Sequence, residues 1–128
     1  PGADTAGAGR AAVESAAGDP AALAALSRHL ETLTAEGRIE WALVNLPGPF
    51  VLSSSFGAQA AVALHMVTQV DPGVPVVMVD TQYLFPETLQ FASQLQQRLG
   101  FDLRVYRAPL SAADFDARHG RLWEGGAD

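Results

Sequence analysis

Three consecutive hydroxyl residues, Ser53 to Ser55, stand where an apolar run ends and a helical pattern begins. Gly57 follows them, and residues 58–70 have the apolar spacing of a helix. The first N–H groups of a helix have no partner inside it, and the helix dipole places partial positive charge there. Hydroxyls and backbone amides gathered at such a point can bind an anion. The sequence therefore predicts that a loop at residues 53–59, called the serine loop below, binds a phosphate or sulfate group.

This loop differs from a Walker A loop, because its sequence does not end in Gly-Lys-Ser/Thr. It contains no basic residue, so amides and hydroxyls rather than a charged side chain would hold the anion. A plainer interpretation stays open here: a strand-to-helix turn in which the serines cap the helix.

A second polar group follows the next apolar run. The β-rich segment from Val74 ends in Asp80-Thr-Gln-Tyr83, and Pro86 then suits the first turn of another helix. Ligands of open α/β sheets bind beyond the carboxyl ends of the strands. We therefore expect the Asp80 group to lie beside the serine loop.

Arg118, His119 and Arg121 form the only concentrated basic group of the sequence. Such a group can neutralise a phosphate, although a solvated face is an equally simple interpretation. The three histidines share no metal-ligand spacing, so we expect no metal site.

The elements that must position these residues alternate between strand and helix. The pattern predicts strands at 50–54, 75–80 and 102–106, and helices at 58–70, 86–99 and from about Ser111. Gly100 is the expected stop of the second of these helices. Such alternation is typical of βαβ units in an α/β protein with a parallel sheet and right-handed crossovers.

The residues before this region divide into two parts. Residues 1–18 are mostly Ala and Gly, and we expect a flexible tail there that is disordered or weakly helical. Residues 19–48 predict two helices, one starting at Asp19-Pro20 and one capped by Thr34. Residues 49–128 then carry the alternating strands and helices.

The composition limits the classes of function. A net charge of −6 argues against a sequence-independent nucleic-acid binder, which needs a basic face. No apolar run approaches the length of a membrane span, and the start does not resemble a signal peptide, so we expect a cytoplasmic location. The 128 residues contain no cysteine, which excludes disulfides and thiolate chemistry within them.

Taken together, these segments resemble the phosphoadenosine phosphosulfate (PAPS) reductase family. The matching segments keep the family's order and are Leu46-Pro-Gly48, 51–62, Asp80-Thr81, 83–88, 105–108, Ala117-Arg118, Gly120 and 122–124. The resemblance begins near Glu36 and covers the amino-terminal portion of the family. It implies a Rossmann-like adenine nucleotide alpha hydrolase-like (PP-loop) fold, preceded by helices and truncated here, with residues 49–128 as the first part of the nucleotide-binding PAPS reductase domain.

The resemblance also implies roles for single residues. The first loop would hold the phosphosulfate end of the substrate, through Ser53, Ser54, Ser55, Phe56, Gly57, Ala58 and Gln59. The second segment would help hold the adenosine, through Asp80, Thr81, Gln82 and Tyr83. Arg118 and Arg121 would face the 3′-phosphate. Phe56 as a packing residue and Asp80 as a structural residue stay open as alternatives.

Two positions depart from related patterns. Gln59 stands where ATP-using PP-loop relatives carry the aspartate of Ser-Gly-Gly-x-Asp-Ser, and its loss removes an expected magnesium contact. This favours binding of a sulfated nucleotide without ATP cleavage. Gln82 stands where many family members have glycine, so a positive φ at this position would be costly for glutamine.

The family reduces PAPS to sulfite and adenosine 3′,5′-bisphosphate in sulfate assimilation, using a cysteine nucleophile and thioredoxin or glutaredoxin as electron donor. The resemblance therefore implies a phosphoadenylyl-sulfate reductase, homodimeric when full length and without an iron–sulfur cluster. Without a cysteine, these residues would form the nucleotide-binding part and be inactive alone. The alternatives are an adenylyl-sulfate reductase, an ATP-using PP-loop enzyme and a non-catalytic nucleotide-binding module.

Overall fold

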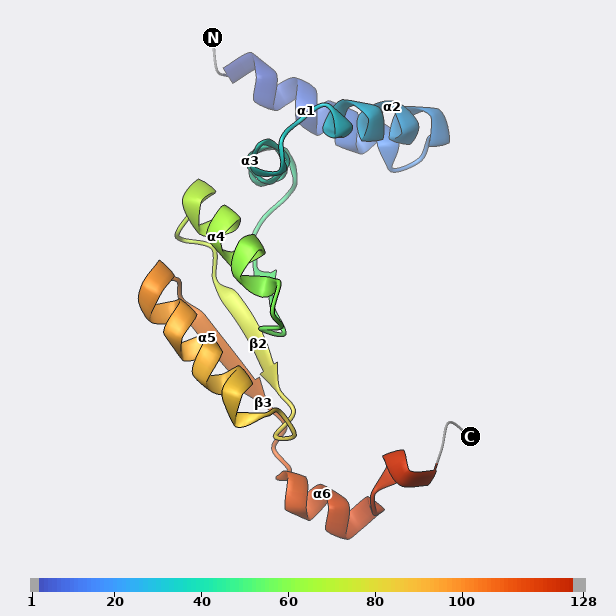
Figure 1. Cartoon of the computed structure of the whole chain (residues 1–128). Coiled ribbons are helices and arrows are strands. Elements are labelled where there is room, and N and C mark those ends of the chain that lie inside the picture. The colour runs from blue at the N-terminus through green and yellow to red at the C-terminus, as the bar shows by residue number, and fades with distance from the viewer. Residues whose placement is uncertain (1–2, 126–128) are drawn as a thin grey trace.

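The computed structural model describes residues 3–125 of the chain. Residues 1–2 of the predicted tail and residues 126–128 of the predicted domain lie outside this range. The molecule is elongated, with helices α1 to α3 at one end, a small sheet in the middle and α6 at the other end (Figure 1). The elements in order are α1 (Ala3–Ala16), α2 (Pro20–Glu31), α3 (Ala35–Asn45), β1 (Leu52–Ser53), α4 (Ala60–Val70), β2 (Val76–Asp80), α5 (Pro86–Leu99), β3 (Leu103–Arg107), α6 (Ala112–His119) and the 3₁₀ helix η1 (Leu122–Gly125).

The two predicted amino-terminal helices begin where their caps predicted. The Asp19 side chain accepts a hydrogen bond from the Ala21 N–H at 3.0 Å, and Thr34 Oγ1 accepts one from the Gly37 N–H at 3.0 Å. Residues 3–16, where we expected a flexible tail, form α1, which packs against α2 and α3. The high helix propensity of alanine explains how a sequence with few large apolar residues forms this helix.

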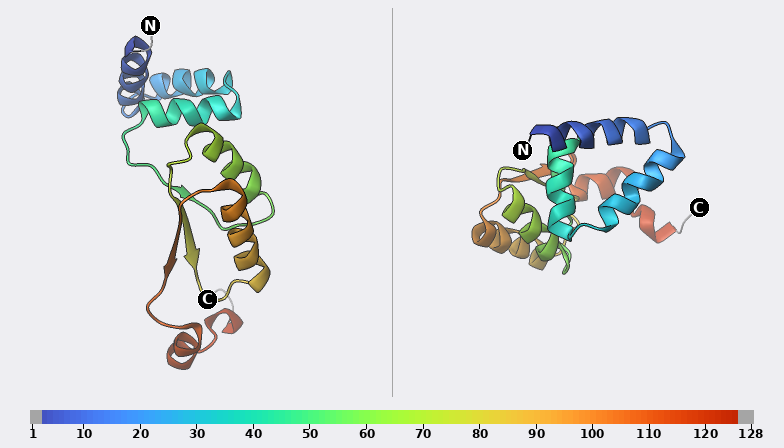
Figure 2. Two further views of the ribbon diagram at one scale, coloured as in Figure 1. Left: turned by 90° about the vertical axis from the view of Figure 1, so that its left-hand side faces the viewer. Right: turned by 90° about the horizontal axis from the view of Figure 1, so that it is seen from above.

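The middle of the molecule is a parallel sheet with strand order β1-β2-β3. Helices α4 and α5 cover the same face of this sheet, as the edge-on view shows (Figure 2). The α/β class and the parallel sheet are therefore confirmed. Strand β1 is shorter than the predicted 50–54, because only Leu52 and Ser53 pair with β2.

The core lies between the sheet and its two helices. It is formed by seven buried side chains: Phe56, Leu64, Val76, Met78, Ala92, Leu95 and Phe101. Because side chains alternate across a strand, Val76 and Met78 point into this core while Val79 faces the other way. Gly100 ends α5 in the left-handed conformation with φ 75°, as its position in the sequence predicted.

Candidate functional site

The serine loop begins at the carboxyl end of β1. The Ser54 N–H donates to the Val77 carbonyl at 2.9 Å, which holds the loop start against β2. The Ser54 hydroxyl then accepts a hydrogen bond from the Phe56 N–H at 3.1 Å. Ser54 therefore shapes the turn, while Ser53 and Ser55 are exposed.

Phe56 anchors the loop from below. Its side chain is only 2% exposed, and its ring centroid lies 6.3 Å from that of Phe101. Its backbone has φ 54°, a conformation that is rare for a bulky residue. Such strain persists where the surroundings enforce it, and here the buried ring does so. The ring packs beneath the loop, and only the backbone of Phe56 lies at the candidate anion site.

Four backbone N–H groups of this loop have no protein acceptor among residues 3–125: those of Ser55, Gly57, Ala58 and Gln59. They lie immediately before α4, whose N-cap residue is Gln59 and which has no side-chain cap. The interpretation that the serines cap this helix is therefore wrong. Unpaired amides at a helix start, next to hydroxyls, are suited to an anion.

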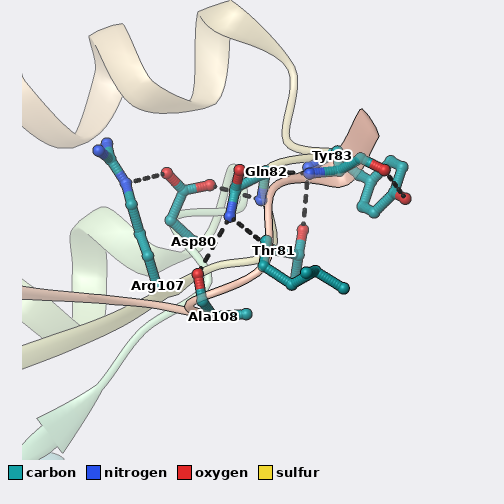
Figure 3. Close-up of polar contacts among 8 residues, drawn as sticks. Asp80, Thr81, Gln82, Tyr83, Arg107 and Ala108 are labelled. Carbon is teal, nitrogen blue, oxygen red and sulfur yellow. Dashed lines mark hydrogen bonds and ion pairs between the residues drawn. The ribbon is translucent and has the colours of Figure 1, made fainter. Parts of the chain in front are cut away.

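Asp80 lies at the carboxyl end of the neighbouring strand, β2. It is buried, with 5% exposed, and both carboxylate oxygens are engaged (Figure 3). Oδ1 accepts from the Gln82 N–H at 2.8 Å, and Oδ2 accepts from Arg107 Nε at 2.7 Å. These two bonds, the backbone bond first, lower the pKa of Asp80 below its ordinary value of 3.8. Asp80 is therefore an ionised carboxylate that organises the turn after β2.

Arg107 is the partner that the sequence did not single out. It ends β3 at the register position opposite Asp80, and its side chain is 64% exposed. A basic residue at the end of the third strand was the available signal. Its charge compensates the buried carboxylate, because a buried ion needs a partner.

Gln82 and Tyr83, which follow β2, bond to α6 and to the segment that leads into it. Gln82 has φ 66°, so the positive φ considered for this position is present. Its carboxamide contacts Ala108 (Figure 3) and also hydrogen-bonds to the backbone of Leu110 and Ala112. The Tyr83 hydroxyl donates to Asp116 Oδ1 at 2.7 Å, and this bond raises the pKa of Tyr83 above 10.0. The Thr81 hydroxyl accepts from the Tyr83 N–H at 3.3 Å.

The basic group at the end of α6 is exposed. Arg121 Nη1 pairs with Glu124 Oε1 at 2.9 Å, and the His119 ring lies 4.9 Å from that of Phe115. The Arg118 side chain makes no hydrogen bond or ion pair within the described residues. No contact among these residues brings Arg118 or Arg121 against the serine loop. The side chain of Trp123 lies outside the described residues.

The structure thus brings the ends of β1 and β2 together at one sheet edge, and it links the second of them to α6. Within the described residues no group of three or more His, Asp or Glu side chains could hold a metal ion. Across the same part of the chain, no helix has the length and apolar character needed to cross a membrane.

Comparison with known proteins identifies related sequences. A family profile described as "Phosphoadenosine phosphosulfate reductase domain" matches residues 49–127. A phosphoadenosine 5′-phosphosulfate reductase of Serratia proteamaculans is 56% identical over 111 residues, which are 87% of this chain and 46% of that protein. One of Klebsiella pneumoniae is 58% identical over 107 residues, which are 84% of this chain and 44% of that protein.

A solved structure supports the same fold. The phosphoadenylyl-sulfate (PAPS) reductase from Candida auris, in a phosphate complex, superposes with a TM-score of 0.72 at 24% identity, over 84% of this chain and 54% of that one. The chain spans about half the length of the relatives it matches. On the family match and the sequence identities, the chain belongs to the phosphoadenosine phosphosulfate reductase family.

Proposed function

We propose that this chain is the nucleotide-binding part of a thioredoxin-dependent phosphoadenylyl-sulfate reductase. The observation that carries the proposal is the loop of free backbone amides between β1 and α4, in a chain of this family. In this proposal the loop from Ser53 to Gln59 receives the phosphosulfate group. The backbone around Asp80 and Thr81 supports the adenosine, at the end of the neighbouring strand.

The reaction divides its chemistry between two parts of a protein. A thiolate attacks the sulfur of PAPS and the sulfur–oxygen bond breaks, leaving a cysteine S-sulfonate and adenosine 3′,5′-bisphosphate. Reduced thioredoxin or glutaredoxin then releases sulfite and becomes oxidised. These 128 residues contain no cysteine, so their share is to bind and orient the nucleotide. They are expected to release no sulfite alone.

Gly57→Val tests the anion loop with little risk to the fold. A Cβ at Gly57 would meet only Ser55 Oγ at 3.9 Å, an ordinary contact, and the φ of Gly57 is not in the left-handed region. The branched side chain would stand among the free amides and block them. In the natural polypeptide that carries these residues, we expect calorimetry to show at least about tenfold weaker binding of adenosine 3′,5′-bisphosphate.

Gly18→Val is the matched control, since a Cβ there meets nothing within 4 Å and its φ is not left-handed. If both variants and the parent bind adenosine 3′,5′-bisphosphate with equal affinity at unchanged melting temperature, the serine loop does not bind the anion. Sulfite release from PAPS with reduced thioredoxin tests the reaction itself. A preference for adenylyl sulfate over PAPS in the same assay would identify the other reductase type.

A further inference from the structure

The side chain of Gln82 is fully committed to the segment after β3. Its Nε2 donates to the Leu110 carbonyl at 3.0 Å and to the Ala108 carbonyl at 3.3 Å, while its Oε1 accepts from the Ala112 N–H at 3.3 Å. A primary amide has two N–H donors, and both have acceptors here. This leaves the carboxamide little capacity to bind a nucleotide directly.

One of these bonds completes a helix start. Ala112 is the first residue of α6, and its N–H is one of the donors that a helix cannot satisfy internally. The Ser111 hydroxyl accepts a hydrogen bond from the Asp114 N–H at 3.1 Å. Ser111 and Gln82 therefore each satisfy one N–H donor at the start of α6. Gln82 thus caps α6 from a loop 30 residues earlier in the chain.

Tyr83 supplies a second attachment to the same helix. Its hydroxyl donates to Asp116 Oδ1 at 2.7 Å and also lies 3.3 Å from the Ala112 carbonyl oxygen. Gln82 therefore holds the beginning of α6, and Tyr83 holds its middle. We name these two side chains the α6 clasp.

The clasp is needed because α6 has little other support. Figure 1 shows α6 standing clear of α4 and α5 at the end of the molecule. All side chains of α6 are exposed or only half-buried. An element with few buried apolar contacts depends on its polar attachments to stay ordered.

The left-handed backbone of Gln82 supports the same interpretation. A non-glycine residue with φ 66° is strained relative to glycine, because its Cβ crowds the backbone in this conformation. At this position glutamine supplies the carboxamide hydrogen bonds, and glycine cannot.

We propose that Gln82 is a positioning residue, which with Tyr83 fixes α6 to the carboxyl edge of the sheet so that the edge is ordered for the nucleotide. The effect on nucleotide binding rests on the proposed function, whereas the clasp itself does not. Gln82 would act through α6 and the 108–112 segment, not through contact with the substrate.

Hydrogen exchange tests the clasp without any ligand. The variants are Gln82→Gly, which removes the carboxamide and relieves the backbone, Gln82→Asn, which tolerates a positive φ but is one methylene shorter, and Tyr83→Phe. Losing a hydrogen bond worth about 1 kcal/mol predicts about fivefold faster exchange of the amides of α6 in each variant. The amides of α4 and α5 should keep their rates.

The double variant Gln82→Gly/Tyr83→Phe separates a clasp from two unrelated contacts. If both side chains hold one element, their effects on exchange in α6 will not add. Unchanged exchange of α6 in Gln82→Gly and Gln82→Asn would overturn the clasp, whatever the protein binds.

Nucleotide binding then tests the consequence, in the natural polypeptide. Gln82→Gly should weaken adenosine 3′,5′-bisphosphate about three- to tenfold and raise the KM for PAPS, with kcat kept within twofold. Faster exchange in α6 with unchanged affinity and KM would overturn the positioning role. Absence of nucleotide binding by the parent would instead overturn the proposed function and leave the exchange result standing.

Discussion

At the scale of single residues, the candidate site depends on side chains that shape backbone more than on side chains that face a ligand. The Ser54 hydroxyl accepts a hydrogen bond from the Phe56 N–H, and the buried Phe56 ring enforces the left-handed backbone of the turn. Together they leave the following amides unpaired. An anion held in this way contacts main chain, so the serine loop can bind it without a basic residue.

Ser54→Ala tests this arrangement. The variant removes the acceptor of the Phe56 N–H, so the turn loses a hydrogen bond worth about 1 kcal/mol. We expect about fivefold weaker binding of adenosine 3′,5′-bisphosphate by the natural polypeptide, measured by calorimetry. Ser93→Ala, at an exposed position of α5, is the control and should bind as the parent does. Equal affinities in the two variants would contradict a shaping role for Ser54.

At the scale of elements, the ends of strands and helices are fixed by caps and ion pairs. Asp80 closes β2 by binding both the turn that follows and the end of β3. Gly100 ends α5 and returns the chain to β3. Each of these ends sets the position from which the next segment starts, so their effect on stability can be measured separately.

The Asp80 pair predicts a pH dependence with a defined sign. The pKa of Asp80 is lowered in the folded protein, so its stabilisation is present above the ordinary value of 3.8 and is lost as the pH falls through the lower folded-state value. Asp80→Asn should therefore melt below the parent at about pH 6, and this gap should close in strong acid. A gap that persists unchanged at about pH 2 would show that the charge of Asp80 does not stabilise the fold.

Gly100→Ala tests the end of α5. A Cβ at Gly100 meets nothing within 4 Å, so the cost comes from its φ of 75° alone. We expect a loss of about 1 kcal/mol in the free energy of unfolding, and a melting temperature lower by about 4 °C. In Gly18→Ala, where the φ is not left-handed and a Cβ again meets nothing, the stability should stay equal or rise slightly. Similar losses in both variants would contradict the account of the α5 cap.

At the scale of the whole molecule, the two faces of the sheet differ. Helices α4 and α5 bury one face, and the described residues leave the other uncovered (Figure 2). Val79 and Tyr106 are register partners on that open face and are 64% and 57% exposed. An apolar surface of this kind attracts other apolar molecules.

This open face should bind a hydrophobic dye. We expect the chain to enhance the fluorescence of anilinonaphthalene sulfonate, and Val79→Thr/Tyr106→Thr to reduce the signal at least about twofold at equal melting temperature. Threonine keeps a high strand propensity, so the sheet should persist. Val62→Thr on α4, where Val62 is 62% exposed, is the matched control. Equal dye signals in all three proteins would place the dye elsewhere.

The sequence by itself determined the order of the elements from α2 to α6, the parallel class of the sheet and several helix ends. These depend on local chemistry: Asp19, Thr34, Ser111 and Gly100 act within a few residues of their own positions. Local pattern also placed the serine loop at the end of the first strand. It placed the start of α4 two residues too early, because no side-chain cap marks that start.

Only the tertiary structure decided which distant groups meet. The Arg107 bond to Asp80 spans 27 residues and the Gln82 and Tyr83 bonds to α6 span about 30, so no local spacing encodes them. The sheet register places Arg107 beside Asp80. The fold then brings α6 within reach of the Gln82 and Tyr83 side chains. Burial decided the role of Phe56 for the same reason, since its packing against Phe101 joins segments that are distant in sequence.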